Sequence, residues 1–177
     1  MLDNEQLMKK TQANIVVIDD QEDILFAVKM LLKKHFETIH TLNNPKNVVK
    51  LLSENTIDVV LLDMNYRIGF EDGREGLYLL KEIKTLSPKT AIILMTAFGK
   101  LETAVEGLKI GAFDYVLKPW ENDKLVFTIK QAVEESRREQ KKANKTITNN
   151  VISEQYVYDK QYVYLEKDIV SSIQDTK

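Results

Sequence analysis

A chain of 177 residues, 44% of them hydrophobic, can bury a core, which excludes an intrinsically disordered polypeptide. The absence of cysteine excludes a disulfide framework, a thiolate zinc site and thiol redox chemistry. The net charge of −2 gives no overall attraction to nucleic acid or to an anionic membrane. No apolar run has the length of a bilayer span or of a signal peptide core, so we expect a cytoplasmic protein.

Five short apolar runs have the length and the β-branched content of strands. The first, residues 14–18 (NIVVI), is unbroken, as is typical of a strand buried on both faces. The others cover residues 38–42, 58–62, 90–95 and 114–117. Each is short enough to be a strand rather than a buried helix.

Amphipathic stretches follow each of these runs. They predict helices over residues 24–36, 45–55, 76–86, 100–112 and 121–140. Strands and helices that alternate in this way predict an α/β fold: a doubly wound, five-stranded parallel sheet with helices on both faces.

Apolar residues at helical spacing predict the buried faces of three helices. These residues are Ile24, Val28, Leu31 and Leu32 in the first helix, Leu101, Val105 and Leu108 in the fourth, and Leu125, Ile129 and Val133 in the last. Gly107 and Gly111 either weaken the fourth helix or mark its end. His35 should end the first helix and His40 lies in the second strand; neither is assigned a role.

Reactive side chains stand at or just past the ends of four different strands: Asp19, Asp63, Thr96 and Lys118. In an open parallel sheet, ligands bind beyond the carboxyl ends of the strands. We therefore expect these four side chains to meet at one edge of the sheet.

Negative charge is concentrated after the first strand, where Asp19 and Asp20 precede Glu22 and Asp23. Carboxylates this close repel one another, so a cation should compensate. Asp20 and Asp63 offer the oxygen ligands that Mg²⁺ prefers. A lysine and a hydroxyl nearby suit phosphoryl oxygens, so the pattern predicts a Mg²⁺-assisted site with a carboxylate that accepts a phosphoryl group.

Four motifs carry a family resemblance: VIDD, VVLLDMN, ILMTA and DYVLKPW, in this order. Over residues 13–135 the sequence resembles the receiver domain of two-component response regulators, which has a flavodoxin-like fold. The sequence motifs LLDMN, MTA and KPWE are most similar to those of receivers in enhancer-binding, nitrogen-regulatory type transcription activators. The resemblance implies a switch protein, not an enzyme, that is phosphorylated by a sensor histidine kinase and acts in transcriptional regulation.

Carried over residue by residue, the resemblance implies that Asp63 is the phosphoacceptor. It also implies that a magnesium ion is held by Asp19, Asp20, Asp63 and the backbone carbonyl of Asn65.

The resemblance further implies that Thr96, Ala97 and Lys118 bind the phosphoryl group and that Thr96 and Tyr115 form the conformational switch. A cis peptide bond is expected between Lys118 and Pro119. The family also suggests a homodimer formed through the fourth helix, the fifth strand and the fifth helix.

Each of these residues has a structural alternative when it is taken singly. An acidic pair at a helix start can be a cap, and Tyr115 can be half-buried packing. The receiver interpretation is favoured because it accounts for every position at once.

Three other functions use similar folds. A phosphohydrolase with an aspartyl-phosphate intermediate would need a second aspartate where Asn65 stands. A flavin binder would need a phosphate-binding loop where the acidic stretch lies. A scaffold that works without phosphate is disfavoured because every expected site residue is present.

Four segments fall outside the pattern. Residues 1–12 are an N-terminal extension, and the loop 64–75 is either a tolerated insertion or a flap over the site. Residues 136–150 are predicted to form a polar helical extension or a linker. Residues 151–177 are a tail of unknown role, or the start of a truncated or divergent output region; no phosphate-binding loop of an ATPase occurs.

Overall fold

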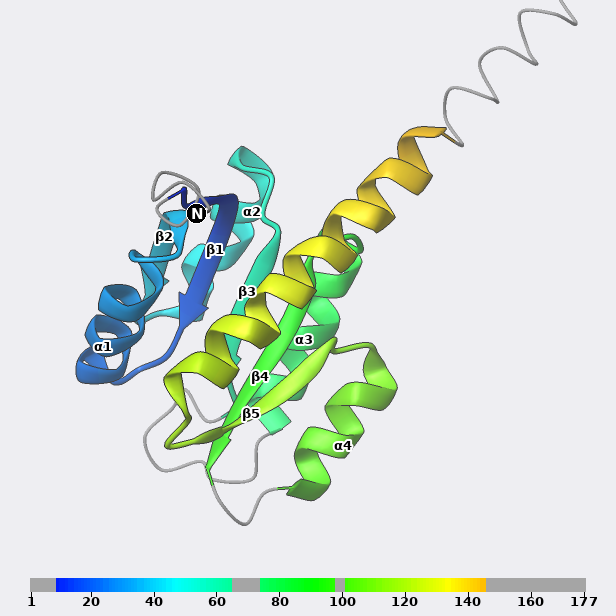
Figure 1. Ribbon diagram of the computed structural model, residues 1–177. Helices are drawn as coiled ribbons and strands as arrows, with labels where there is room; N and C mark the ends of the chain where they lie inside the picture. The colour runs from blue at the N-terminus through cyan, green and yellow to red at the C-terminus, as the bar shows by residue number, and fades with distance from the viewer. Residues whose placement is uncertain (1–8, 65–73, 98–100, 146–177) are drawn as a thin grey trace, which may run out of the picture. The chain divides into compact units, whose positions relative to one another are not determined.

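The computed structural model describes residues 9–64, 74–97 and 101–145 of the chain. Five strands form one parallel sheet in the order β2-β1-β3-β4-β5 (Figure 1). They are β1 (Thr11–Ile18), β2 (Phe36–Leu42), β3 (Val59–Asp63), β4 (Ala91–Ala97) and β5 (Asp114–Lys118). The predicted five-stranded parallel sheet is confirmed.

Helices cover both faces of this sheet. They are α1 (Glu22–Leu32), the short 3-10 helix η1 (Pro45–Asn47), α2 (Val48–Glu54), α3 (Arg74–Leu86) and α4 (Leu101–Ile110). Residues 122–145 are also helical. Buried residues of α1 and of residues 122–137 pack on one face, and those of α2 and α3 pack on the other, which α4 also covers (Figure 1).

The unbroken apolar run of β1 fills both layers of the core. Ile15 and Val17 pack with α1, whereas Val16 and Ile18 pack with α2 and α3. Successive strand residues point to opposite faces, so a strand covered on both sides needs apolar residues throughout.

The predicted apolar face of the last helix is confirmed. Leu125, Ile129 and Val133 are each completely buried. They lie in the cluster that joins this helix to α1 and to the sheet.

The first helix is shorter than predicted. It ends at Leu32, and Phe36 is the first residue of β2. The backbone N–H of Thr11 donates to the carbonyl of His35 at 2.8 Å, and Thr11 pairs with Phe36. This pairing and the full burial of Phe36 outweigh continuation of the helix, so the prediction that His35 ends the helix is wrong.

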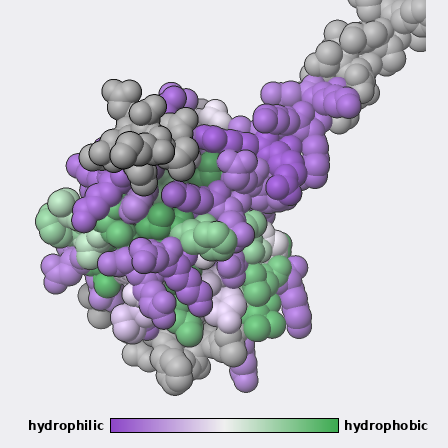
Figure 2. Space-filling model, in the orientation of Figure 1, coloured by the Kyte–Doolittle hydropathy of each residue, from purple (hydrophilic) through white to green (hydrophobic). Residues whose placement is uncertain are grey.

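Two predicted helix faces need correction. On α1 the fully buried side chains are Leu25, Val28 and Leu32, while Ile24 is only partly buried. On α4 Val105 is 40% exposed, and apolar surface over this helix is visible in Figure 2. Leu108 packs against the core as predicted, beside the buried Ala104 and Gly107, and the side chain of Leu101 lies outside the described part of the structure.

Two further helix features differ in detail. The segment 45–55 is divided into η1 and α2, and the Asn44 side chain caps the start of η1 by accepting a hydrogen bond from the backbone N–H of Lys46 at 3.0 Å. Gly107 lies inside α4, and the helix ends before Gly111, whose φ of +118° is costly for other residues. Of the two glycines, Gly111 marks the end.

The first strand begins before the expected start of the receiver-like segment. β1 begins at Thr11, inside the segment expected to be an extension, and the chain divides into compact units between Arg137 and Arg138. Arg137 donates a hydrogen bond to the carbonyl of Gln12. Most of the loop 64–75 and all of the tail 151–177 lie outside the described residues. None of the described helices has the length and apolar character of a membrane span.

Candidate functional site

The register of the sheet brings distant residues to one edge. Ile18 pairs with Leu62, so Asp19 and Asp63 follow paired positions on neighbouring strands. Farther across, Ala97 pairs with Lys118. The carboxyl ends of β1, β3, β4 and β5 therefore meet, as the sequence predicts.

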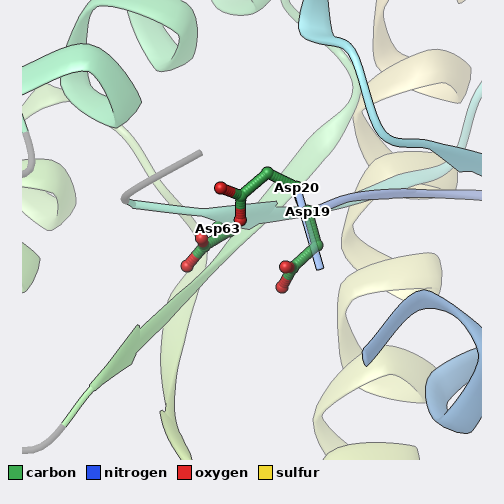
Figure 3. A group of neighbouring side chains, drawn as sticks. All are labelled: Asp19, Asp20 and Asp63. Carbon is green, nitrogen blue, oxygen red and sulfur yellow. The ribbon is translucent and has the colours of Figure 1, made fainter. Parts of the chain in front are cut away.

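Three carboxylates gather at this edge. One oxygen from each of Asp19, Asp20 and Asp63 lies within 4.8 Å of the others, with Asp63 arriving from β3 and the acid pair from the end of β1 (Figure 3). Asp19 is completely buried, and Asp63 is 3% exposed. Their mutual repulsion is strong because little water screens it.

Lys118 partly offsets this repulsion. Its Nζ atom lies 2.6 Å from Oδ2 of Asp19 and 2.9 Å from Oδ1 of Asp63. Burial lowers the pKa of Lys118, but the hydrogen bond to Asp19 and the charge of Asp63 raise it by more, so the net pKa lies above 10.5. The side chain is therefore an ammonium ion at neutral pH.

The loop that carries the acid pair is anchored to the neighbouring strand. The N–H of Asp19 donates to the carbonyl of Leu42 at 3.1 Å, and the N–H of Gln21 donates to Oδ1 of Asp19 at 2.9 Å. The Asn43 side chain donates to Glu22 at 2.6 Å. Glu22 is thus paired with a residue just past the end of β2 and is not one of the three clustered carboxylates.

The donor set fits a hard divalent cation. Oδ1 of Asp20 is buried and accepts no hydrogen bond from the described part of the chain. A buried, unpaired carboxylate oxygen is costly, and a bound cation would remove that cost. Lys118 supplies one positive charge to a cluster of three carboxylates, and a metal ion would offset their charge further. The three aspartates could therefore hold a metal ion.

Comparison with known proteins decides the family. The model of the response regulator receiver domain matches residues 15–130 of the chain. The chain belongs to the response regulator receiver family.

Solved structures and curated proteins agree with this assignment. The receiver matches the N-terminal signal receiver domain of a Bacteroides fragilis response regulator with a TM-score of 0.64 and 40% identity, over 70% of this chain and 98% of that one. It also matches NtrX from Brucella abortus with a TM-score of 0.67 and 27% identity, over 75% of this chain and 30% of that one.

The curated relatives are longer proteins. A putative NtrX-like response regulator of Rickettsia bellii is 36% identical over 68% of this chain and 25% of its own length. The transcriptional regulatory protein ZraR of Klebsiella oxytoca is 36% identical over 73% of this chain and 28% of its own length. The receiver thus spans about a quarter of the length of these relatives, and the predicted likeness to receivers of transcription activators is confirmed.

Thr96 and Tyr115, the expected switch residues, lie on one face of this receiver. Leu94 pairs with Tyr115, and both pack on the side of α3 and α4. Thr96 follows Leu94 by two positions and therefore points to the same face. Thr96 is completely buried and Tyr115 is partly buried.

Three other expected positions complete the comparison with the sequence. The peptide bond between Lys118 and Pro119 is cis. The backbone of Ala97 lies beside Lys118 in the sheet. Asn65, the expected backbone ligand, lies outside the described residues.

Sequence reasoning missed the supports of the acid pair. Neither the Gln21 N–H nor the Asn43 side chain was a candidate, and an asparagine after a strand is an ordinary loop residue. It also did not anticipate that Lys118 bridges Asp19 and Asp63.

Proposed function

We propose that Asp63 of this receiver accepts a phosphoryl group from a sensor histidine kinase in a Mg²⁺-dependent reaction. The observation that carries this proposal is the meeting of three carboxylates with Lys118 at the carboxyl edge of the sheet. Such a site combines a nucleophilic oxygen with cations that offset charge on the transferring group. Family membership supports it, because receivers of response regulators take phosphate from histidine kinases.

The proposed metal ligands are Asp19, Asp20, Asp63 and the backbone carbonyl of Asn65. Mg²⁺ is the cation proposed because all of these ligands are oxygens and Mg²⁺ keeps part of its water shell. The ion would neutralise negative charge on the phosphoryl oxygens.

The proposed step is a displacement at phosphorus. A carboxylate oxygen of Asp63 forms a bond to the phosphorus atom of a phosphohistidine. The phosphorus–nitrogen bond breaks, and its electron pair remains on the imidazole, which leaves and takes its proton from solvent. Asp63 is placed for attack beside the ammonium group of Lys118, 2.9 Å from its Oδ1 atom, which would offset charge on the transferring group.

Three groups are proposed to bind the transferred phosphoryl group. Lys118 would exchange its contact with Asp63 for one with a phosphoryl oxygen, and the Thr96 hydroxyl and the Ala97 backbone N–H would donate to others. The chain accepts one phosphoryl group and changes conformation; we do not propose that it turns over a substrate.

The proposed output is control of transcription through a homodimer. The likeness to a transcriptional regulatory protein supports this output. The dimer surface proposed is formed by α4, β5 and residues 122–137, with residues 136–150 as a linker to an output region. We propose a cytoplasmic location and no direct nucleic-acid contact by this chain.

Phosphorylation with acetyl phosphate tests the proposal. With Mg²⁺, the intact mass should rise by one phosphoryl group, and Asp63→Asn should abolish this rise while the protein stays folded. Omission of Mg²⁺ should also prevent labelling. Undiminished labelling of Asp63→Asn would show that another residue is the acceptor.

A further inference from the structure

Gly76, in the first turn of α3, packs directly against the backbone of Met64. A Cβ atom added at Gly76 would lie 2.7 Å from Cα and 2.9 Å from the carbonyl oxygen of Met64. Cβ atoms essentially never come this close to other atoms. Because these are backbone atoms in a close-packed region, a side-chain rotation cannot relieve the overlap.

Met64 directly follows Asp63 and is held from a second side. Its N–H donates to the carbonyl of Met95 in β4 at 3.0 Å, and its side chain is 1% exposed. The backbone that leaves Asp63 is thus enclosed between the start of α3 and the end of β4.

We propose that Gly76 is a positioning residue for Asp63. The close approach of α3 fixes the backbone of Met64. The fixed backbone in turn sets the direction in which the Asp63 side chain projects from the end of β3. The inference rests on the proposed function, since it concerns the placement of Asp63 relative to Asp19, Asp20 and Lys118.

The tolerance of the site explains why this placement matters. Any side chain at residue 76 would force the backbone of Met64 and the start of α3 apart by several tenths of an ångström to reach ordinary contact. Metal–ligand distances must hold within about 0.2 Å, and a misplacement of about 1 Å can reduce a rate by about 100-fold.

Gly107 in α4 provides a matched control. A Cβ atom there would meet the Cδ1 atom of the Leu94 side chain, with no backbone atom among its near contacts. Gly107→Ala therefore makes the same chemical change in another helix on the same face of the sheet, without pressing on the backbone next to Asp63.

The test compares Gly76→Ala and Gly107→Ala with the natural chain. Circular dichroism measures folding, calorimetry measures Mg²⁺ affinity, and intact mass follows the rate of labelling by acetyl phosphate. For folded Gly76→Ala, we expect Mg²⁺ affinity to fall about tenfold or more and the labelling rate by about 100-fold. Gly107→Ala should lose stability but bind Mg²⁺ as the natural chain does.

The double variant Met64→Ala/Gly76→Ala separates positioning from side-chain packing. Trimming Met64 removes its sulfur, 3.1 Å from the added Cβ, but leaves the overlaps with Cα and the carbonyl oxygen. Mg²⁺ affinity should therefore stay low, and its recovery would overturn the proposal.

Two other outcomes distinguish failure of the positioning role from failure of the proposed function. If Gly76→Ala is folded and matches the natural chain in Mg²⁺ affinity and labelling, the positioning role is wrong while the proposed function stands. If the natural chain neither binds Mg²⁺ nor is labelled, both fail.

Should Gly76→Ala not fold, hydrogen exchange in the natural chain still tests the idea. The Met64 amide should exchange as slowly as that of Leu62 in β3. Exchange as fast as an exposed loop amide would show that the backbone is not held.

Discussion

The ammonium group of Lys118 lies 2.6 Å from the completely buried carboxylate of Asp19, although the two residues are 99 positions apart in the chain. The contact joins the first strand to the last strand and places positive charge inside the acidic cluster. Lys118 therefore has a structural role that is separate from its proposed contact with a phosphoryl group.

We predict that Lys118→Met destabilises the metal-free protein by about 3–5 kcal/mol, because it removes the ammonium group that pairs with the buried carboxylates of Asp19 and Asp63. Urea unfolding without metal measures this loss. Mg²⁺ should stabilise the variant more than the natural chain, since the ion then replaces the missing charge.

Lys130→Met is the matched control for that experiment. Lys130 is exposed on the helix formed by residues 122–145, so its loss should change stability by less than about 1 kcal/mol. Equal effects of the two substitutions would argue against a structural role for the Lys118 ion pairs.

The stabilisation of the folded protein by Lys118 should be lost only as the pH rises. Its pKa in the folded protein is raised above the ordinary 10.5, so the folded state holds this proton more tightly than the unfolded chain does. The contribution is complete below pH 10.5 and declines as the pH rises through the folded pKa.

The difference in unfolding free energy between the natural chain and Lys118→Met measures this contribution, since other lysines titrate in both proteins. It should stay constant from neutral pH to pH 10.5 and narrow above it. A difference that widens with rising pH would contradict the assigned direction.

We predict that Asp20→Asn removes Mg²⁺ binding without destabilising the metal-free protein. The substitution relieves repulsion with Asp19 and Asp63, and Oδ1 of Asp20 has no hydrogen bond from the described residues to lose. Thermal melting without metal should be unchanged or higher. A ligand at 100 times its Kd stabilises by about 2.7 kcal/mol, and this gain should vanish.

Asp23→Asn controls for the loss of a charge in the same acidic stretch. Asp23 is exposed, and it lies in the first turn of α1 outside the three-aspartate cluster. The Asp23→Asn variant should still be stabilised by Mg²⁺ as the natural chain is. A sharp drop in the metal-free melting temperature of Asp20→Asn would instead identify the acid pair as structural.

The proposed switch predicts a change in association. A beryllofluoride mimic with Mg²⁺ should draw Thr96 and Lys118 toward Asp63 and allow Tyr115 to turn inward. The proposed dimer surface carries Leu117, 37% exposed, and a cavity of about 400 Å³ beside Trp120. Sedimentation should show stronger association with the mimic.

Thr96→Ala and Tyr115→Ala should still bind the mimic but lose most of this response. Sedimentation of each variant with and without the mimic, alongside amide spectra of residues 101–120, measures the coupling. If the mimic binds to the natural chain yet changes neither quantity, the switch proposal fails even with Asp63 as the acceptor.

The sequence by itself determined that five strands alternate with helices in a parallel sheet and at which edge of that sheet the site forms. The run 14–18 is apolar throughout because a strand covered on both faces has no polar side, and this signal is local. The positions of Asp19, Asp63, Thr96 and Lys118 at the ends of four different strands then placed them at one edge by the rule for parallel sheets.

Only the tertiary structure decided which residues compensate one another. The pairing of Lys118 with Asp19 depends on strand order and register, which bring together groups 99 positions apart. The end of α1 at Leu32 likewise depended on the pairing of Thr11 with Phe36, which helix periodicity cannot reveal. In the sequence, Gly76 looks like an ordinary glycine near the start of a helix. Only the close approach of α3 to Met64 shows why no larger side chain fits there.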